Sequence, residues 1–224
     1  MTAFLRFFER LMLLGAVAFM VSASQPAASA PAGWEVLSND DGIEVARKTM
    51  PNSSLFAFRG KAVLNVHVAI LAETLINDAI GPEWVDLMYL SKMLKQEGRH
   101  SKIIRQGYDL PWPISDRDYV MRQVADFNAD TKVVTLKFES IQYAGMPVQD
   151  CCVRANAYRT YWRLEALPGG KTKAEVEVFT DPMGLLPSWL INLIQADWPS
   201  NTLTGLYTRA TKGDIKPHPD AAAW

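Results

Sequence analysis

The chain contains few cysteines and histidines and has almost no net charge. Its 224 residues include two cysteines and three histidines, and the formal net charge at neutral pH is −1. This balance gives no basic face for a nucleic acid and no polybasic membrane patch, so we expect no nucleic-acid partner. The histidines His67, His100 and His218 lack metal-ligand spacing, so we also expect no metal and no cofactor.

The two cysteines are neighbours in the sequence. Cys151 and Cys152 cannot staple distant parts of the chain together, because there is no third cysteine. We interpret them as two small residues in or beside a strand. A disulfide between the adjacent residues and an intermolecular bridge are the alternatives.

Sequence motifs of catalysis are missing as well. The chain has no G-x-S-x-G elbow, no P-loop and no dinucleotide-binding glycine fingerprint. Asp116 and Asp118 lie close together, but strand alternation makes them turn and strand-start residues rather than an acid–base pair. A cavity tyrosine, Tyr119 or Tyr158, protonating an enolate is the catalytic alternative. We therefore expect that the protein is not an enzyme.

The first 32 residues are typical of an export signal. A basic start precedes an unbroken apolar run over residues 11–21, and a stretch rich in alanine and serine follows. The apolar run is about half the ~20 residues that a membrane-spanning helix needs, although an uncleaved anchor is the alternative. We expect a periplasmic or secreted protein with a signal peptide over residues 1–32, one domain over 33–213 and a flexible tail over 214–224.

The apolar pattern of the remaining chain changes its period twice. Alternation predicts strands within residues 43–48, 56–66, 104–108, 119–127, 134–138, 158–164 and 176–178. Helical spacing predicts helices at 68–76, 82–94 and 188–212. The last helix is apolar on most faces and so must be enclosed. This order predicts an α+β fold, a curved antiparallel sheet around one long C-terminal helix.

The predicted inner faces of the strands mix large apolar side chains with amides and hydroxyls. Gln106, Gln123 and Thr160 lie among the apolar residues. An unpaired buried amide costs roughly 1–3 kcal/mol, so this mixture favours a hydrophobic cavity with a few polar groups over a solid core. In the alternative, the amides bond to neighbouring backbone or lie at the rim of the sheet.

Three short motifs carry a family resemblance. They comprise Pro111-Trp112-Pro113 followed by Arg117-Asp118-Tyr119-Val120; then Asp181, Gly184, Pro187 and Asn192; and, more weakly, Asp78 followed by Trp84. In this order and spacing, they resemble the START (steroidogenic acute regulatory protein-related lipid transfer) family, and most of all its phosphatidylcholine-transfer type. The resemblance covers residues 34–212.

The resemblance implies a helix-grip fold with a tunnel for one lipid. The protein is then expected to bind a phospholipid, fatty acid or other acyl or polycyclic lipid and to carry it between membranes, as a monomer with transient membrane contact. Pro111 to Pro113 are expected to form a rigid loop, and Arg117 and Asp118 a local ion pair. The expected lipid contacts are Trp84, Met88, Tyr108, Met121, Gln123, Phe138, Trp162, Met183, Trp189, Asn192, Leu193 and Trp198.

One departure from the family pattern bears on the ligand. Sterol-binding members resemble one another in a buried arginine–acid pair, and the corresponding positions fall near Gln123 and Ile104 here. The pair is expected to be absent, which disfavours a sterol and leaves a phospholipid, a fatty acid or a hopanoid-like lipid. Two alternative functions stay open, a cyclase- or hydrolase-like enzyme for an aromatic polyketide or steroid, and a lipid sensor that transfers nothing.

Overall fold

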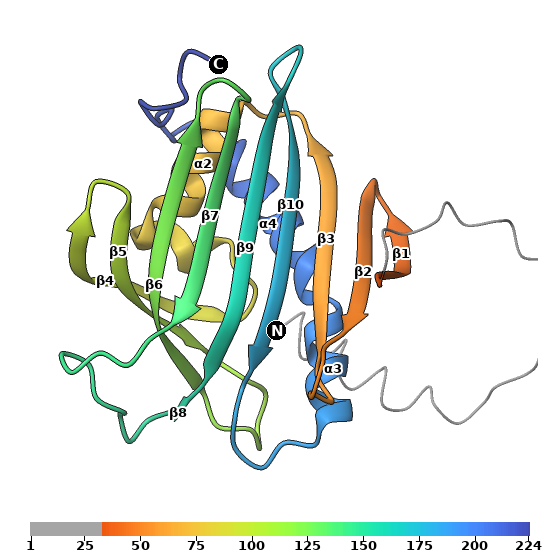
Figure 1. Ribbon diagram of the computed structural model, residues 1–224, viewed down its shortest axis with the longest axis vertical. Helices are drawn as coiled ribbons and strands as arrows, with labels where there is room; N and C mark the ends of the chain where they lie inside the picture. Colours follow the sequence, from red (N-terminus) through yellow and green to blue (C-terminus); the bar gives the residue numbers. More distant parts are fainter. Residues whose placement is uncertain (1–32) are drawn as a thin grey trace, which may run out of the picture.

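A computed structural model describes residues 33–224 of the protein, so the expected signal peptide lies outside the described residues. Figure 1 shows a curved sheet with helices on one of its faces. The strands are β1 (Glu35–Asp40), β2 (Ile43–Thr49), β3 (Phe56–Leu64), β4 (Met88–Gly98), β5 (Ser101–Tyr108), β6 (Arg117–Asn128), β7 (Val133–Ser140), β8 (Val153–Arg154), β9 (Asn156–Leu167) and β10 (Lys171–Asp181). The helices are α2 (Val68–Ile76), the 3₁₀ helix η2 (Asp78–Glu83), α3 (Ser188–Ala196) and α4 (Trp198–Ala210).

The sheet runs in the order β1-β2-β3-β10-β9-β7-β6-β5-β4. Neighbours in this order pair antiparallel, and β3 is joined to β10 from near the other end of the chain. The two-residue strand β8 is parallel to the start of β6 and lies off this path. The expected α+β helix-grip architecture, a curved antiparallel sheet with a C-terminal helix, is confirmed.

Helices α2 and α4 lie on the same face of the sheet, and α4 contacts β2, β3 and β10. The approach of α4 to β3 depends on Gly60, where an added Cβ would lie 2.8 Å from Leu203 Cδ1 and 2.9 Å from Pro199 Cβ. Leu203 and Leu206 are fully buried beneath the helix. The C-terminal helix is divided into α3 and α4, with Pro199 in the first turn of α4, where a missing backbone donor is tolerated.

The second helix expected between the early strands, over residues 82–94, is wrong. Only the short 3₁₀ turn η2 forms there, and β4 begins at Met88. Strand β4 pairs with β5 through three register shifts, each of which inserts an unpaired residue and interrupts the two-residue alternation. The interrupted alternation on this edge strand produces apolar spacings of three and four that imitate a helix.

The C-terminal segment 214–224, expected to be a flexible tail, is packed against the domain. His218 donates its backbone N–H to Ala69 O at the start of α2, and its ring stacks on Phe127 with centroids 4.4 Å apart. Ala221 is fully buried, and the carbonyl of Trp224 lies 3.0 Å from His67 Nε2. The tail therefore closes the end of the sheet next to α2.

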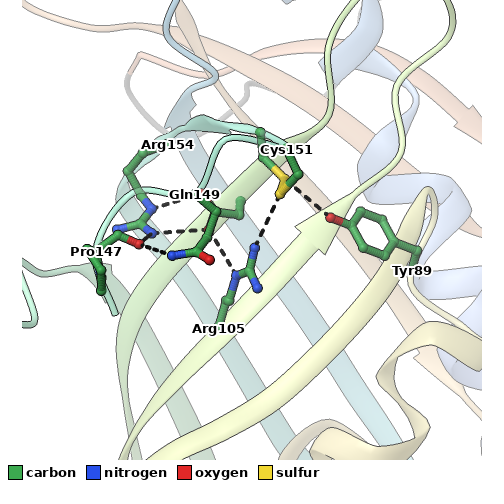
Figure 2. The surroundings of a disulfide bond; sticks show 8 residues. Tyr89, Arg105, Pro147, Gln149, Cys151 and Arg154 are labelled. Atoms are coloured by element: carbon green, nitrogen blue, oxygen red, sulfur yellow. Dashed lines mark hydrogen bonds and ion pairs between the residues drawn. A yellow bond between two sulfur atoms is a disulfide. The ribbon is translucent and has the colours of Figure 1, made fainter. Parts of the chain in front are cut away.

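Cys151 and Cys152 form a disulfide, so the interpretation as two separate small residues is wrong and the vicinal disulfide is what the structure contains. Figure 2 shows the bond facing side chains of β4 and β5. Tyr89 Oη lies 3.6 Å from Cys152 Sγ, and Arg105 Nη2 lies 3.7 Å from Cys151 Sγ. These contacts attach the loop before β8 to the sheet.

Candidate functional site

A cavity of about 140 Å³ lies between the helix-covered face of the sheet, η2 and the two C-terminal helices. Its walls are mainly apolar. Besides the residues discussed below, the wall includes Leu75, Val85, Leu87, Leu110, Ala157, Val178 and Leu186. Pockets that enclose drug-sized ligands measure ~300–1,000 Å³, so a ligand of that size or larger requires the walls to move apart.

Most of the expected contact residues line this cavity. They come from η2 and its C-cap, from five strands of the sheet and from the start of α4. These residues are Trp84, Met88, Tyr108, Met121, Phe138, Trp162 and Trp198. Trp84 and Trp162 pack edge to face with their ring centroids 6.3 Å apart.

The other expected contacts do not line the cavity. They are Gln123, Met183, Trp189, Asn192 and Leu193. Gln123 is buried on β6, whereas Met183, Trp189 and Leu193 are exposed. Asn192 binds the protein itself, because its Nδ2 donates to Ser54 O and its Oδ1 accepts from Phe56 N, each at 3.0 Å.

Helix α3 turns a different face to the cavity from the one expected. Ile191, Ile194 and Gln195 line the wall at the spacing of three and four that places residues on one helical face. The same spacing was visible in the sequence. Because Trp189, Leu190 and Leu193 supply an equally apolar face, it could not decide which face points inward.

Arg117 lines the cavity at the start of β6 and is 3% exposed. It donates from Nε to Pro182 O at 3.1 Å, from Nη2 to Met183 O at 3.2 Å and from Nη1 to Ser115 O. Burial lowers the pKa of Arg117 below its usual range. This guanidinium therefore ties the loop between β10 and α3 to the sheet.

The expected ion pair between Arg117 and Asp118 is not formed. Neighbouring residues of a strand point to opposite faces, and the fully buried Asp118 instead accepts from Arg105 Nε at 2.9 Å and from Arg154 Nε at 2.8 Å. Asp118 thus joins β5 and β8 to β6, away from the cavity.

Two tyrosines stand next to Arg117 on the cavity wall. Tyr108 and Tyr119 lie edge to face with centroids 5.5 Å apart. Burial raises the pKa of Tyr119 to about 12 despite a hydrogen bond with Thr180, and burial also raises the pKa of Tyr108. Both phenols therefore stay protonated at neutral pH and act as neutral hydrogen-bonding groups.

A buried ion pair closes the cavity beside η2. Lys102 Nζ lies 2.5 Å from Asp78 Oδ2 and donates to Ile76 O at 2.6 Å. Lys102 faces Gln123 across the β5–β6 pair, two positions from the pairing of Ile104 with Met121. The pair between Lys102 and Asp78 joins residues far apart in the chain, so no local sequence pattern indicates it.

The wall also contains polar atoms without a partner in the described part of the chain. Trp84 Nε1, Thr202 Oγ1 and Gln195 Oε1 are buried, and all three residues line the cavity. Thr202 lies in a polar stretch of α4, so its place on the cavity wall could not be predicted from the sequence.

Several large apolar side chains near the cavity are exposed, and they belong to α3 and to loops. Leu185, Trp189 and Trp112 are largely exposed, with exposed fractions of 103%, 63% and 86%. The loop containing Leu185 adjoins the start of β6 through Arg117, and Leu110 and Leu186 line the cavity together. We call Trp112, Leu185 and Trp189 the apolar rim.

Residues 33–224 contain no group of three or more histidine, cysteine or acidic side chains that is arranged to hold a metal ion. No helix in the same range has the length and hydropathy to cross a membrane.

Sequence comparisons find relatives along most of the chain. The START domain model matches residues 18–195. An uncharacterized protein of Pseudomonas aeruginosa is 31% identical over 208 residues, which cover 91% of this chain and 97% of the relative. Bovine phosphatidylcholine transfer protein is 29% identical over 167 residues, covering 72% of this chain and 76% of that protein.

Solved structures share the fold. The STAR-related lipid transfer protein of Xanthomonas axonopodis has a TM-score of 0.72 at 23% identity, over 80% of this chain and 99% of that one. Human STARD10 has a TM-score of 0.76 at 16% identity, over 82% of this chain and 75% of that one. With the family model matching most of its length and the same fold in these structures, the chain belongs to the START domain family.

Proposed function

We propose that the protein binds one acyl lipid in its cavity and carries it between membranes as a monomer. The proposed site of action is outside the cytoplasm, where a signal peptide over residues 1–32 would direct the chain. The observation that carries the proposal is an apolar cavity with an exposed apolar rim beside it. The lipid transfer proteins named above support it, since they are of the same family.

Loading requires the cavity to open, and α3 is the wall best suited to move. Ile191 is the one buried residue within this helix, whereas α4 buries several side chains. Burying a ~16-carbon chain is worth about 13 kcal/mol against water, at ~0.8 kcal/mol per methylene. A bilayer already provides that burial, so moving the acyl chain from the bilayer into the cavity changes the free energy little. The barrier to transfer therefore lies in opening the cavity.

The apolar rim lies next to the wall of the cavity that is proposed to open. Leu185 and Trp189 flank the start of α3, so a membrane that buries them contacts the wall that must move. Tryptophan suits the boundary between headgroups and acyl chains, because its ring is apolar and its N–H is polar. We therefore propose that the rim docks on the bilayer and that α3 swings away while docked.

Transfer of a fluorescent phosphatidylcholine between vesicles tests this proposal. The double variant Leu185→Glu with Trp189→Glu is expected to slow transfer at least tenfold, because charged carboxylates resist burial in the bilayer. Val63→Glu is the matched control, since Val63 is also exposed but lies on β3, away from the rim. The control is expected to transfer at the wild-type rate.

The lipid recovered after transfer is then analysed by mass spectrometry. Carriage predicts an unchanged lipid in the acceptor vesicles, while a chemically altered lipid would indicate an enzyme. Wild-type protein that neither takes up nor transfers the probe would overturn the proposal. Rim variants as fast as the control would overturn membrane docking through α3 and leave carriage in place.

A further inference from the structure

Trp84 presents an unused hydrogen-bond donor to the cavity. The residue follows η2, is 9% exposed, and its Nε1 has no partner in the described part of the chain. An indole N–H can only donate, so whatever satisfies it must be an acceptor. The edge-to-face packing against Trp162 holds the ring in the wall.

Thr202 presents a second unused group, from helix α4. It is fully buried in α4, lines the cavity, and its Oγ1 has no partner among residues 33–224. A buried threonine in a helix ordinarily donates to the carbonyl one turn back. Thr74 in α2 does so, with Oγ1 2.7 Å from Ile70 O. The hydroxyl of Thr202 has not taken this local bond and is available to the cavity.

The packing of α4 places Trp84 next to the turn of helix that contains Thr202. A Cβ added at Gly205 would lie 2.1 Å from Trp84 O, so the helix backbone touches Trp84 within one turn of Thr202. An unpaired buried polar group destabilises the folded protein. A protein that leaves both unpaired in one apolar cavity is arranged for a ligand that supplies the missing acceptor.

We infer that Trp84 and Thr202 form a polar subsite that binds a carbonyl oxygen of the lipid inside the cavity. This inference rests on the proposed lipid-binding function and narrows its ligand class. A carbonyl oxygen has two lone pairs and can accept from the indole N–H and the threonine O–H together. Esters, free acids and ketones meet this requirement, whereas the hydrocarbon part of a lipid does not.

The test compares two lipids that differ only in the carbonyl groups. Dioleoylglycerol carries two ester carbonyls, and 1,2-di-O-oleylglycerol carries ethers in their place with the same chains and the same free hydroxyl. Each lipid is titrated as a competitor of a bound fluorescent fatty acid. Wild-type protein is expected to prefer the diester by at least about fivefold, which is the effect of one net hydrogen bond.

The variants Trp84→Phe and Thr202→Val remove the two donors and keep most of the side-chain shape. Each is expected to reduce the preference for the diester several-fold without weakening the binding of the diether. Trp198→Phe and Thr160→Val are the matched controls. Both residues line the same cavity, and neither contributes a buried unpartnered atom in the described chain. The controls are expected to keep the wild-type preference.

Three results would overturn the subsite. Wild-type protein that binds the two lipids equally would remove the subsite and leave lipid carriage intact. A preference lost equally in the test and control variants would show that it does not come from Trp84 and Thr202. Binding of neither lipid would overturn both the subsite and the carrier function.

Discussion

Replacing Gly205 by alanine is expected to destabilise the protein, because α4 touches Trp84 at this glycine. The new Cβ would lie 2.1 Å from Trp84 O and 3.1 Å from Trp84 C. Contacts of this kind are not made below 3.0 Å, so the helix or the Trp84 backbone must shift by roughly 1 Å. Neither of the clashing groups is a flexible side-chain end that could turn away.

Two effects of opposite sign set the change in the free energy of unfolding. Alanine favours a helix interior by ~1 kcal/mol over glycine. Overpacking costs ~1–3 kcal/mol and more where backbone is displaced. We expect the second effect to win by about 2 kcal/mol, which corresponds to a melting temperature lower by about 4–8 °C for a domain of this size. Thermal unfolding followed by circular dichroism measures this difference.

Gly98→Ala is the matched control for this variant. A Cβ at Gly98 would meet nothing within 4 Å, so the same chemical change is made in open space. The control is expected to keep the wild-type melting temperature or to raise it slightly, because alanine restricts the unfolded chain. A Gly205→Ala protein that melts within about 1 °C of wild type would refute the close packing of α4 on Trp84.

Two further predictions follow from buried charged or titratable groups. Asp118→Asn is expected to lower the free energy of unfolding by about 3 kcal/mol in urea titrations, because Arg105 and Arg154 lose the buried carboxylate they share; an unchanged midpoint would contradict the shared ion pair. Burial lowers the pKa of His218, so the folded protein favours the neutral ring. The stability contributed by packing His218 against Phe127 is therefore complete above the unfolded pKa of ~6.5. It is lost as the pH falls from there toward the lowered pKa. Fluorescence of Trp224, whose ring lies against Phe127, should report this loss of packing as the pH falls. His218→Phe should remove the pH dependence, because the stacking on Phe127 no longer depends on a proton.

The strands of the sheet could be predicted from the sequence where their own two-residue alternation is uninterrupted. Alternation over residues 119–127 and 134–138 marked β6 and β7, which pair without a register shift. Strand β4 could not be found in this way. Its irregular pairing with β5 destroys the period of two on which any such prediction depends.

Cavity residues on strands could be predicted from the sequence better than those on helix α3. A strand has two faces, so once the large apolar side chains are assigned inward, Met121, Phe138 and Trp162 are placed on the cavity wall. Helix α3 has apolar residues around most of its circumference, and the face it presents is set by the bonds of Asn192 to the start of β3. Those bonds join residues far apart in the sequence and leave no local pattern.

The cavity itself results from the shape of the sheet and the placing of its helices. Helix α4 lies against β2, β3 and β10, while the β4–β7 half of the sheet faces η2 and α3 across the cavity. Helix α4 covers only part of the sheet, and the remaining space is bounded by η2 and α3, in which Ile191 is the one buried residue. The enclosure is therefore weakest where the apolar rim is exposed, and opening it breaks few packing contacts of the core around Leu203 and Leu206. The proposed carrier function requires this separation, because the core must stay folded while one wall of the cavity moves.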